Sequence, residues 1–142
     1  MVKTTRKRNV DPSKRAIVNG YRSGLEEKVS AQLGSLGVPF EYEKLKVKYL
    51  VNEVRTYTPD FRLPNGIIIE TKGRFVAADR KKHLLIQKQD PFLDIRFVFT
   101  NSRAKISKGS NTSYADWCEK NGFLYADKLI PEEWINEAVG KS

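Results

Sequence analysis

The sequence predicts an α/β fold in which helices flank one mixed β-sheet, and three observations support this prediction. The chain has 142 residues, the length of one domain, which is enough to bury an apolar core without a disulfide or a structural metal. Two short apolar runs, at residues 67–69 and 97–99, are typical of buried strands. Segments with helical periodicity lie before, between and after these runs, and this alternation indicates an α/β sandwich around a mixed sheet.

Residues 1–20 are predicted to form a flexible basic arm, and residues 21–142 a single folded domain. The arm has almost no apolar periodicity, and its charged side chains are nearly all basic: Lys3, Arg6, Lys7, Arg8, Lys14 and Arg15 against Asp11. A tail that only keeps the protein soluble explains this composition equally well.

The first helix is predicted within residues 23–37, where leucine and valine recur at helical spacing and Gly37 provides a C-terminal stop. Ser23 and Glu26 have the spacing of a capping box, in which the acidic side chain accepts a hydrogen bond at the helix start. Glu26 therefore has an ordinary structural role available beside any role in chemistry.

The strands come next along the chain. Residues 38–50 alternate between apolar and charged side chains, but the alternation changes phase near Lys44, so we expect two strands or one bent strand. Residues 52–56 are interpreted as a connector. Residues 57–61 lead into a further strand, and residues 66–73 form its return strand across a turn at 63–66, whose Asn-Gly pair is typical of hairpins.

The second half of the chain alternates between helices and strands. A helix is predicted at 78–91 and closed by Pro91, and a central strand follows at 94–102. A helix at 111–122 is capped by Thr112 or Ser113 and stopped by Gly122. A short strand at 123–129 and a last helix at 130–138, with Pro131 in its first turn, complete the fold.

The composition narrows the possible partners. The chain carries 26 Lys and Arg against 17 Asp and Glu, a formal net charge of +9, which favours nucleic acid, an anionic membrane or an acidic protein as partner. No apolar run approaches the roughly 20 residues of a membrane span, and no signal-peptide core follows the basic start. We therefore expect a cytoplasmic protein that does not contact a membrane.

The chain has one cysteine and one histidine, which limits the kinds of metal site that it can form. The single Cys118 and the single His83 exclude an intramolecular disulfide and a Cys/His zinc site, so any metal must be held by carboxylates, which favour magnesium, manganese or calcium. His83 lies on the apolar side of its helix and is interpreted as packed. Trp117 and Trp134 have helical core spacing and are interpreted as core or interface residues.

The predicted hairpin brings charged side chains together at one end of the sheet. We expect Asp60 to end one strand and Glu70 to lie on its antiparallel neighbour, and Lys72 faces the same side as Glu70 because side chains alternate with a period of two. Two adjacent carboxylates repel each other, and a divalent cation removes that cost. Such a pair with a lysine is typical of hydrolytic nucleases. Common strand-end charges that face solvent explain the same spacing without any chemistry.

The order of these residues resembles a known motif. Pro59 and Asp60, a gap of nine residues, and then Glu70 and Lys72 resemble the PD-(D/E)xK nuclease motif. Separated blocks along the chain, at 22–33, 40–47, 57–73, 79–86, 112–122 and 129–134, resemble in order the phage endonuclease I family of Holliday-junction resolvases. The resemblance implies a PD-(D/E)xK nuclease-like fold, a domain-swapped homodimer, and cleavage of branched double-stranded DNA at two composite active sites.

The resemblance also assigns roles to individual residues. It implies that Asp60 and Glu70 are shared metal ligands, helped by the carbonyl of Thr71, and that Lys72 is the catalytic lysine. Glu26 would come from the other protomer to complete a second metal site, and Glu41 would belong to the acidic residues of the family's active site. The implied cofactor is Mg²⁺, two ions per active site, with Mn²⁺ also supporting activity. The segment around residues 48–56 would be the bridge across which protomers exchange strands.

Basic residues near predicted strand ends and helix starts are candidates for contact with DNA phosphates. They are Arg22, Arg74, Arg80, Lys81, Lys82, Arg103 and Lys105, with Lys108 close by. Two other functions stay open at this point. The chain could be a nuclease for another DNA substrate, because shape recognition leaves no base-reading motif, or a non-catalytic basic protein that binds DNA bends.

Overall fold

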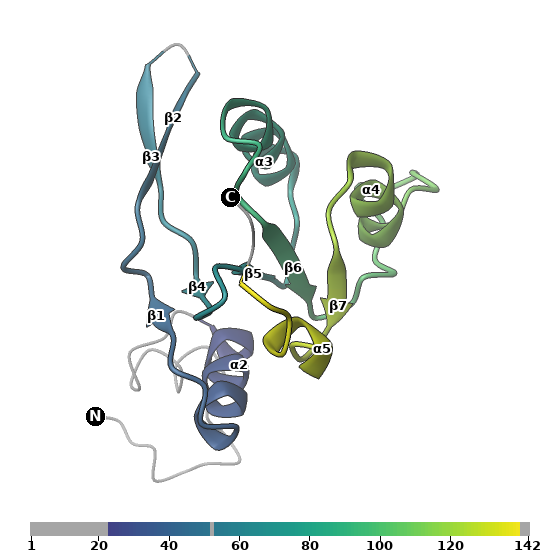
Figure 1. Ribbon diagram of the computed structural model, residues 1–142. Helices are drawn as coiled ribbons and strands as arrows, with labels where there is room; N and C mark the ends of the chain where they lie inside the picture. The colour runs from purple at the N-terminus through teal and green to yellow at the C-terminus, as the bar shows by residue number, and fades with distance from the viewer. Residues whose placement is uncertain (1–22, 52, 140–142) are drawn as a thin grey trace, which may run out of the picture.

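The fold is built around a five-stranded mixed sheet (Figure 1). A computed structural model describes residues 23–51 and 53–139, so the predicted basic arm at 1–20 and the candidate Arg22 lie outside the described residues. The strands in their spatial order are β1 (Glu41–Tyr42), β4 (Phe61–Arg62), β5 (Ile68–Lys72), β6 (Ile95–Phe99) and β7 (Tyr125–Asp127).

The sheet is mixed because its two halves arise from different connections. β1, β4 and β5 pair antiparallel, whereas β5, β6 and β7 pair parallel and are linked by the crossover helices α3 (Ala77–Gln89) and α4 (Tyr114–Asn121). The predicted α/β class and mixed sheet are thereby confirmed.

Helices cover both faces of the sheet, which explains why nearly every residue of β5 and β6 is buried. Neighbouring residues of a strand face opposite sides, so Ile68 packs in one core with α3, α4 and the aromatic side chain of Phe97. Ile69 packs in the other core with Val98, α2 (Gly24–Ser35) and α5 (Glu132–Ile135). Figure 1 shows α3 and α4 on one side of the sheet and α2 and α5 on the other.

A separate two-stranded hairpin consists of β2 (Val47–Leu50) and β3 (Val54–Tyr57), which pair antiparallel. The predicted break between two strands is confirmed, because Glu43 adopts a φ of 53°, a left-handed conformation that ends β1. The interpretation of residues 52–56 as a connector is wrong, since Val54 to Thr56 belong to β3 and pair with β2. Their short alternating pattern was too exposed and too brief to indicate a strand.

The hairpin between β4 and β5 is confirmed, and Asn65 ties it to the rest of the molecule. Gly66 has a φ of 94°, which favours glycine at this position of the turn. The side chain of the buried Asn65 accepts from the Ile67 N–H and donates to the Trp134 carbonyl at 2.8 Å. The turn sets Phe61 opposite Ile69, and this register leads Asp60 toward Glu70.

Element ends agree with the sequence signals, with one exception. Ser113, rather than Thr112, caps α4 in a capping box with Asp116, and Gly122 ends the helix. The last helix is a single turn, and Pro131 precedes it in an extended conformation as the N-cap instead of lying in its first turn. His83, Trp117 and Trp134 are buried as predicted. Within the described ranges, no helix combines the length and apolar character needed to cross a membrane.

Candidate active site

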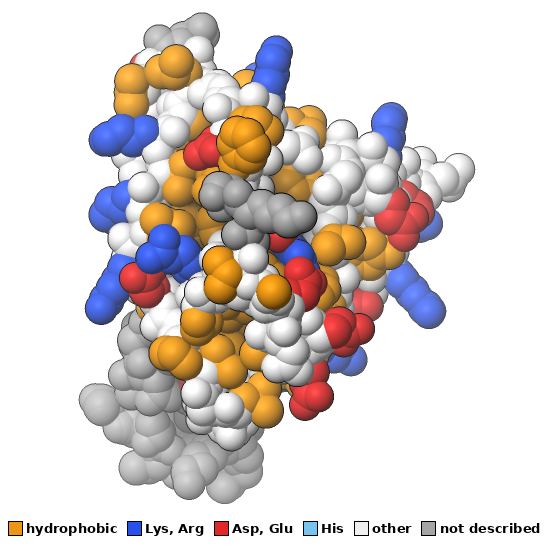
Figure 2. Space-filling view, viewed as in Figure 1, with side chains coloured by type: hydrophobic (Ala, Val, Ile, Leu, Met, Phe, Trp, Pro, Cys, Tyr) orange, Lys and Arg blue, Asp and Glu red, His pale blue; other side chains and the backbone are white. Residues whose placement is uncertain are grey.

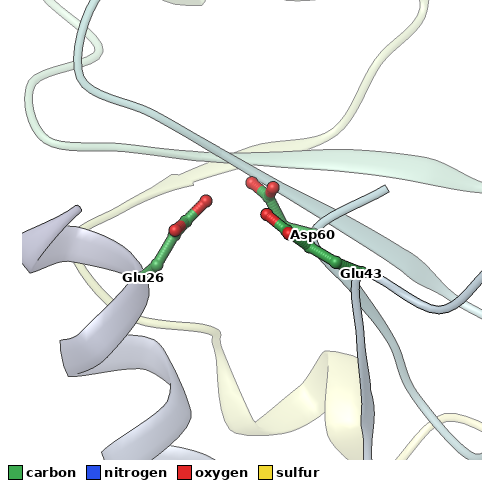
Figure 3. A group of neighbouring side chains, drawn as sticks. All are labelled: Glu26, Glu43 and Asp60. Atoms are coloured by element: carbon green, nitrogen blue, oxygen red, sulfur yellow. The ribbon is translucent and has the colours of Figure 1, made fainter. Parts of the chain in front are cut away.

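Three carboxylates from distant parts of the chain converge beside the sheet (Figure 3). Glu26 comes from the first turn of α2, Glu43 follows β1, and Asp60 precedes β4. One oxygen of each carboxylate lies within 4.8 Å of the other two, an arrangement that could hold a metal ion. We call these three residues the acidic cluster.

Asp60 is fixed in the cluster by Thr71 of the neighbouring strand. The Thr71 N–H and hydroxyl both donate to Asp60 Oδ2, at 2.9 and 2.7 Å. The Asp60 side chain is buried, at 3% exposure, so water solvates its carboxylate very little. Thr71, which the resemblance offers as a ligand through its carbonyl, contacts Asp60 through two other groups.

Glu26 combines a position at the helix start with a place in the cluster. The Ser23 side chain accepts from the Glu26 N–H at 3.1 Å, so the helix is capped through the Glu26 backbone. The Glu26 carboxylate instead accepts from the Tyr42 hydroxyl at 2.7 Å. The Ser23 half of the predicted capping box is therefore observed, and the Glu26 carboxylate takes part in the cluster.

Glu43 is the member of the cluster that sequence reasoning missed. Its N–H donates to the Asp60 carbonyl at 3.1 Å, which attaches the end of β1 to the residue that precedes β4. The left-handed turn at this residue redirects the chain and brings the carboxylate beside Asp60. The change of phase near Lys44 was the signal that could have located it.

Glu41, which the resemblance assigns to the acidic residues of the family's active site, is not a member of the acidic cluster in this chain. It pairs across the sheet with Arg62, and its carboxylate contacts the Arg62 guanidinium at 3.0 Å. In a regular strand Glu41 and Glu43 would face the same side, but the turn at Glu43 separates them. The role predicted for Glu41 stays a prediction.

Glu70 and Lys72 form a second group next to the cluster. The buried Glu70 accepts from the Tyr57 hydroxyl at 2.7 Å, and its other oxygen lies 3.7 Å from Lys72 Nζ. Lys72 also lies 3.5 Å from the Asp79 carboxylate in the first turn of α3. The predicted alternation of Glu70 and Lys72 on one side of β5 is thus observed.

The two groups influence each other electrostatically. Burial raises the pKa of Asp60 to about 8, with further contributions from the negative charges of Glu70 and Glu26, while the hydrogen bonds from Thr71 oppose the shift. Burial also raises the pKa of Glu70, against the lowering effect of Lys72 and of the Tyr57 hydrogen bond. Buried oxygen donors with uncompensated negative charge fit a hard divalent cation such as Mg²⁺.

The predicted DNA-contact residues have mixed surroundings. Arg74, Lys81 and Arg103 are exposed. The Arg80 guanidinium donates to the carbonyls of Phe75 and Ile106, which gives it a structural role, and Lys105 Nζ donates to the Asn111 carbonyl.

Further exposed cations lie on the strands near the site. Figure 2 shows Lys and Arg side chains along the edge of the molecule that β1, β2 and β3 form. The exposed basic residues of these strands and of β4 are Lys48, Arg55 and Arg62, with Lys44 and Lys46 between β1 and β2.

Comparison with known proteins finds a matching family and similar phage proteins. The sequence profile of a family described as phage endonuclease I matches residues 9–142. The chain is 61% identical over 121 residues to a protein named Endonuclease I from Escherichia phage T7, which covers 84% of this chain and 81% of that protein. It is 59% identical over 118 residues to Endodeoxyribonuclease 1 from Enterobacteria phage T3, and the aligned region covers 82% of this chain and 78% of that protein.

Proposed function

Because the chain belongs to the phage endonuclease I family, we propose that it is a magnesium-dependent endodeoxyribonuclease that resolves four-way DNA junctions and other branched DNA. The similar proteins of phages T7 and T3 are named as endonucleases, which supports cleavage of DNA. The net charge of +9 supports binding to a phosphate backbone. Its place of action would be the cytoplasm of the host cell.

The convergence of the acidic cluster with Glu70 and Lys72 is the observation that carries this proposal. Glu26, Glu43 and Asp60 would hold a divalent cation, and Glu70 would share a second one with Asp60. When bound, such ions stabilise the negative charge that develops on a phosphodiester and promote deprotonation of the attacking water. Oxygen ligands of this kind suit Mg²⁺ and also accept Mn²⁺.

The protein's own residues would organise the remaining chemistry. Thr71 keeps Asp60 oriented, and Tyr42 does the same for Glu26. The Lys72 ammonium, placed between Glu70 and Asp79, would orient the attacking water or neutralise charge on the phosphate in the transition state. Burial of the carboxylates keeps these electrostatic interactions strong.

The proposed active form is a domain-swapped homodimer with a PD-(D/E)xK nuclease-like fold and two composite sites. In this single chain, Glu26 already reaches Asp60, so the same contacts would form between chains if α2 and β1 moved to a partner. Two sites in one dimer would allow cleavage of two opposed strands of a junction.

The test compares a labelled four-way junction with a duplex of matched sequence, each incubated with and without Mg²⁺. The proposal predicts Mg²⁺-dependent nicking of the junction at a rate at least about tenfold above that of the duplex. Glu70→Ala should abolish cleavage but keep junction binding in a gel-shift assay, since removing one carboxylate leaves the basic surface intact.

Two outcomes would contradict the proposal in different ways. Equal cutting of both substrates would remove the junction selectivity and leave a general nuclease. Binding of the junction without cleavage under Mg²⁺ or Mn²⁺ would instead favour a non-catalytic protein that recognises bent DNA.

A further inference from the structure

Tyr57 makes a hydrogen bond that joins the β2–β3 hairpin to the candidate active site. It is the last residue of β3, and it is buried, at 1% exposure. Its hydroxyl donates to Glu70 Oε1 at 2.7 Å. A buried hydrogen bond to a carboxylate is stronger than one between neutral groups, and it fixes the orientation of its acceptor.

The Tyr57 ring is itself held from two sides. The imidazole of His83 meets the ring at a centroid distance of 5.1 Å and an interplanar angle of 86°, an edge contact. The Lys82 ammonium lies over the ring at 5.4 Å from its centroid. Burial lowers the pKa of His83 to about 3, so the imidazole is neutral and serves as a packed wall of the ring's site.

The two oxygens of Glu70 therefore have different partners. Oε1 accepts from Tyr57, while Oε2 faces the Lys72 ammonium at 3.7 Å. With Oε1 fixed by a rigid aromatic side chain, the carboxylate cannot rotate freely about its last torsion. The other oxygen is left facing the side where Lys72 lies.

We propose that Tyr57 is a positioning residue that orients Glu70 for binding of the divalent cation. The inference rests on the proposed function, because it assigns Glu70 the role of a metal ligand. Hydrogen-bond partners of metal ligands typically change metal affinity or activity by about 10- to 100-fold when removed. Tyr57 would influence metal affinity although it lies in the β2–β3 hairpin, whose described residues contribute no carboxylate to the site.

The experiment removes one oxygen atom and keeps the ring. Tyr57→Phe should weaken Mn²⁺ binding to the DNA-free protein about tenfold by calorimetry and raise the Mg²⁺ concentration for half-maximal nicking by a similar factor. Tyr49→Phe is the matched control, since Tyr49 is a buried tyrosine of the same hairpin, on β2. It should leave both quantities within about twofold of the unmodified chain.

A double-mutant cycle separates orientation of Glu70 from a general structural effect. In a Glu70→Gln background, Tyr57→Phe should change Mn²⁺ affinity no further, because the two residues act through one contact. A full additional loss in that background would overturn the inference, as would equal Mn²⁺ affinity in Tyr57→Phe and Tyr49→Phe. A chain that neither binds Mn²⁺ nor cuts DNA before any substitution would instead refute the proposed function.

Discussion

Ionisation of the Asp60 carboxyl is unfavourable in the metal-free protein. Its ordinary pKa is 3.8, and burial together with Glu70 and Glu26 raises the pKa to about 8. The folded state therefore favours the protonated carboxyl, so the contribution of Asp60 to folding is fully present below pH 3.8 and is lost as the pH rises through about 8. A site that binds a cation tightly is expected to cost stability when the cation is absent.

Asp60→Asn should stabilise the metal-free protein, and more so at pH 8 than at pH 5. The amide oxygen keeps an acceptor for Thr71 while the negative charge is removed, so the free energy of unfolding should rise by roughly 1–2 kcal/mol at pH 8. Urea denaturation with EDTA at the two pH values measures this gain. Saturating Mg²⁺ should remove it, because only the aspartate form binds the ion. A loss of stability of equal size at both pH values would show that Asp60 acts chiefly through packing.

At the scale of elements, the break between β1 and β2 determines which glutamate lies beside Asp60. The break directs Glu43 to Asp60, whereas Glu41 stays in β1 opposite Arg62. We expect Glu43→Gln to lower Mn²⁺ affinity about tenfold, and Glu41→Gln to lower it less, because only the first removes a member of the acidic cluster. Calorimetric titration of both variants measures the difference. The reverse order would give Glu41 the larger part in metal binding and would favour the place in the family's acidic cluster that the resemblance implies for it.

The sequence predicts elements well where the signal is local. The Asn-Gly pair predicts the hairpin that aligns Asp60 with Glu70, and the period of two predicts that Lys72 joins them. Glu43 was missed because a non-glycine residue with positive φ leaves only one sequence signal, the change of phase near Lys44. The strand at Val54 to Tyr57 was missed because its first three residues are exposed, so no alternation between apolar and polar side chains marks it.

At the scale of the whole molecule, the open question is whether Glu26 and Asp60 of one site belong to one chain. Refolding a mixture of Glu26→Ala and Asp60→Ala chains tests this. A domain-swapped dimer of the two would contain one intact site and one doubly damaged site, so nicking of a four-way junction should return to a measurable fraction of the unmodified rate. Each variant refolded alone is the control. No recovered nicking from the mixture would argue for sites built within single chains.

The β2–β3 hairpin has a consequence for how such a dimer could form. Within one chain, three residues join the strands, so their pairing has an effective concentration on the order of millimolar. The matching strand of a partner chain at micromolar concentration competes poorly with this intramolecular pairing. Exchange is favoured only if the short connection is strained in the monomer or if the domain-swapped dimer buries additional surface. Folding at low protein concentration would then favour the monomer, and folding at high protein concentration would favour the domain-swapped dimer. The join between Leu50 and Val54 would then be the place where the two forms diverge.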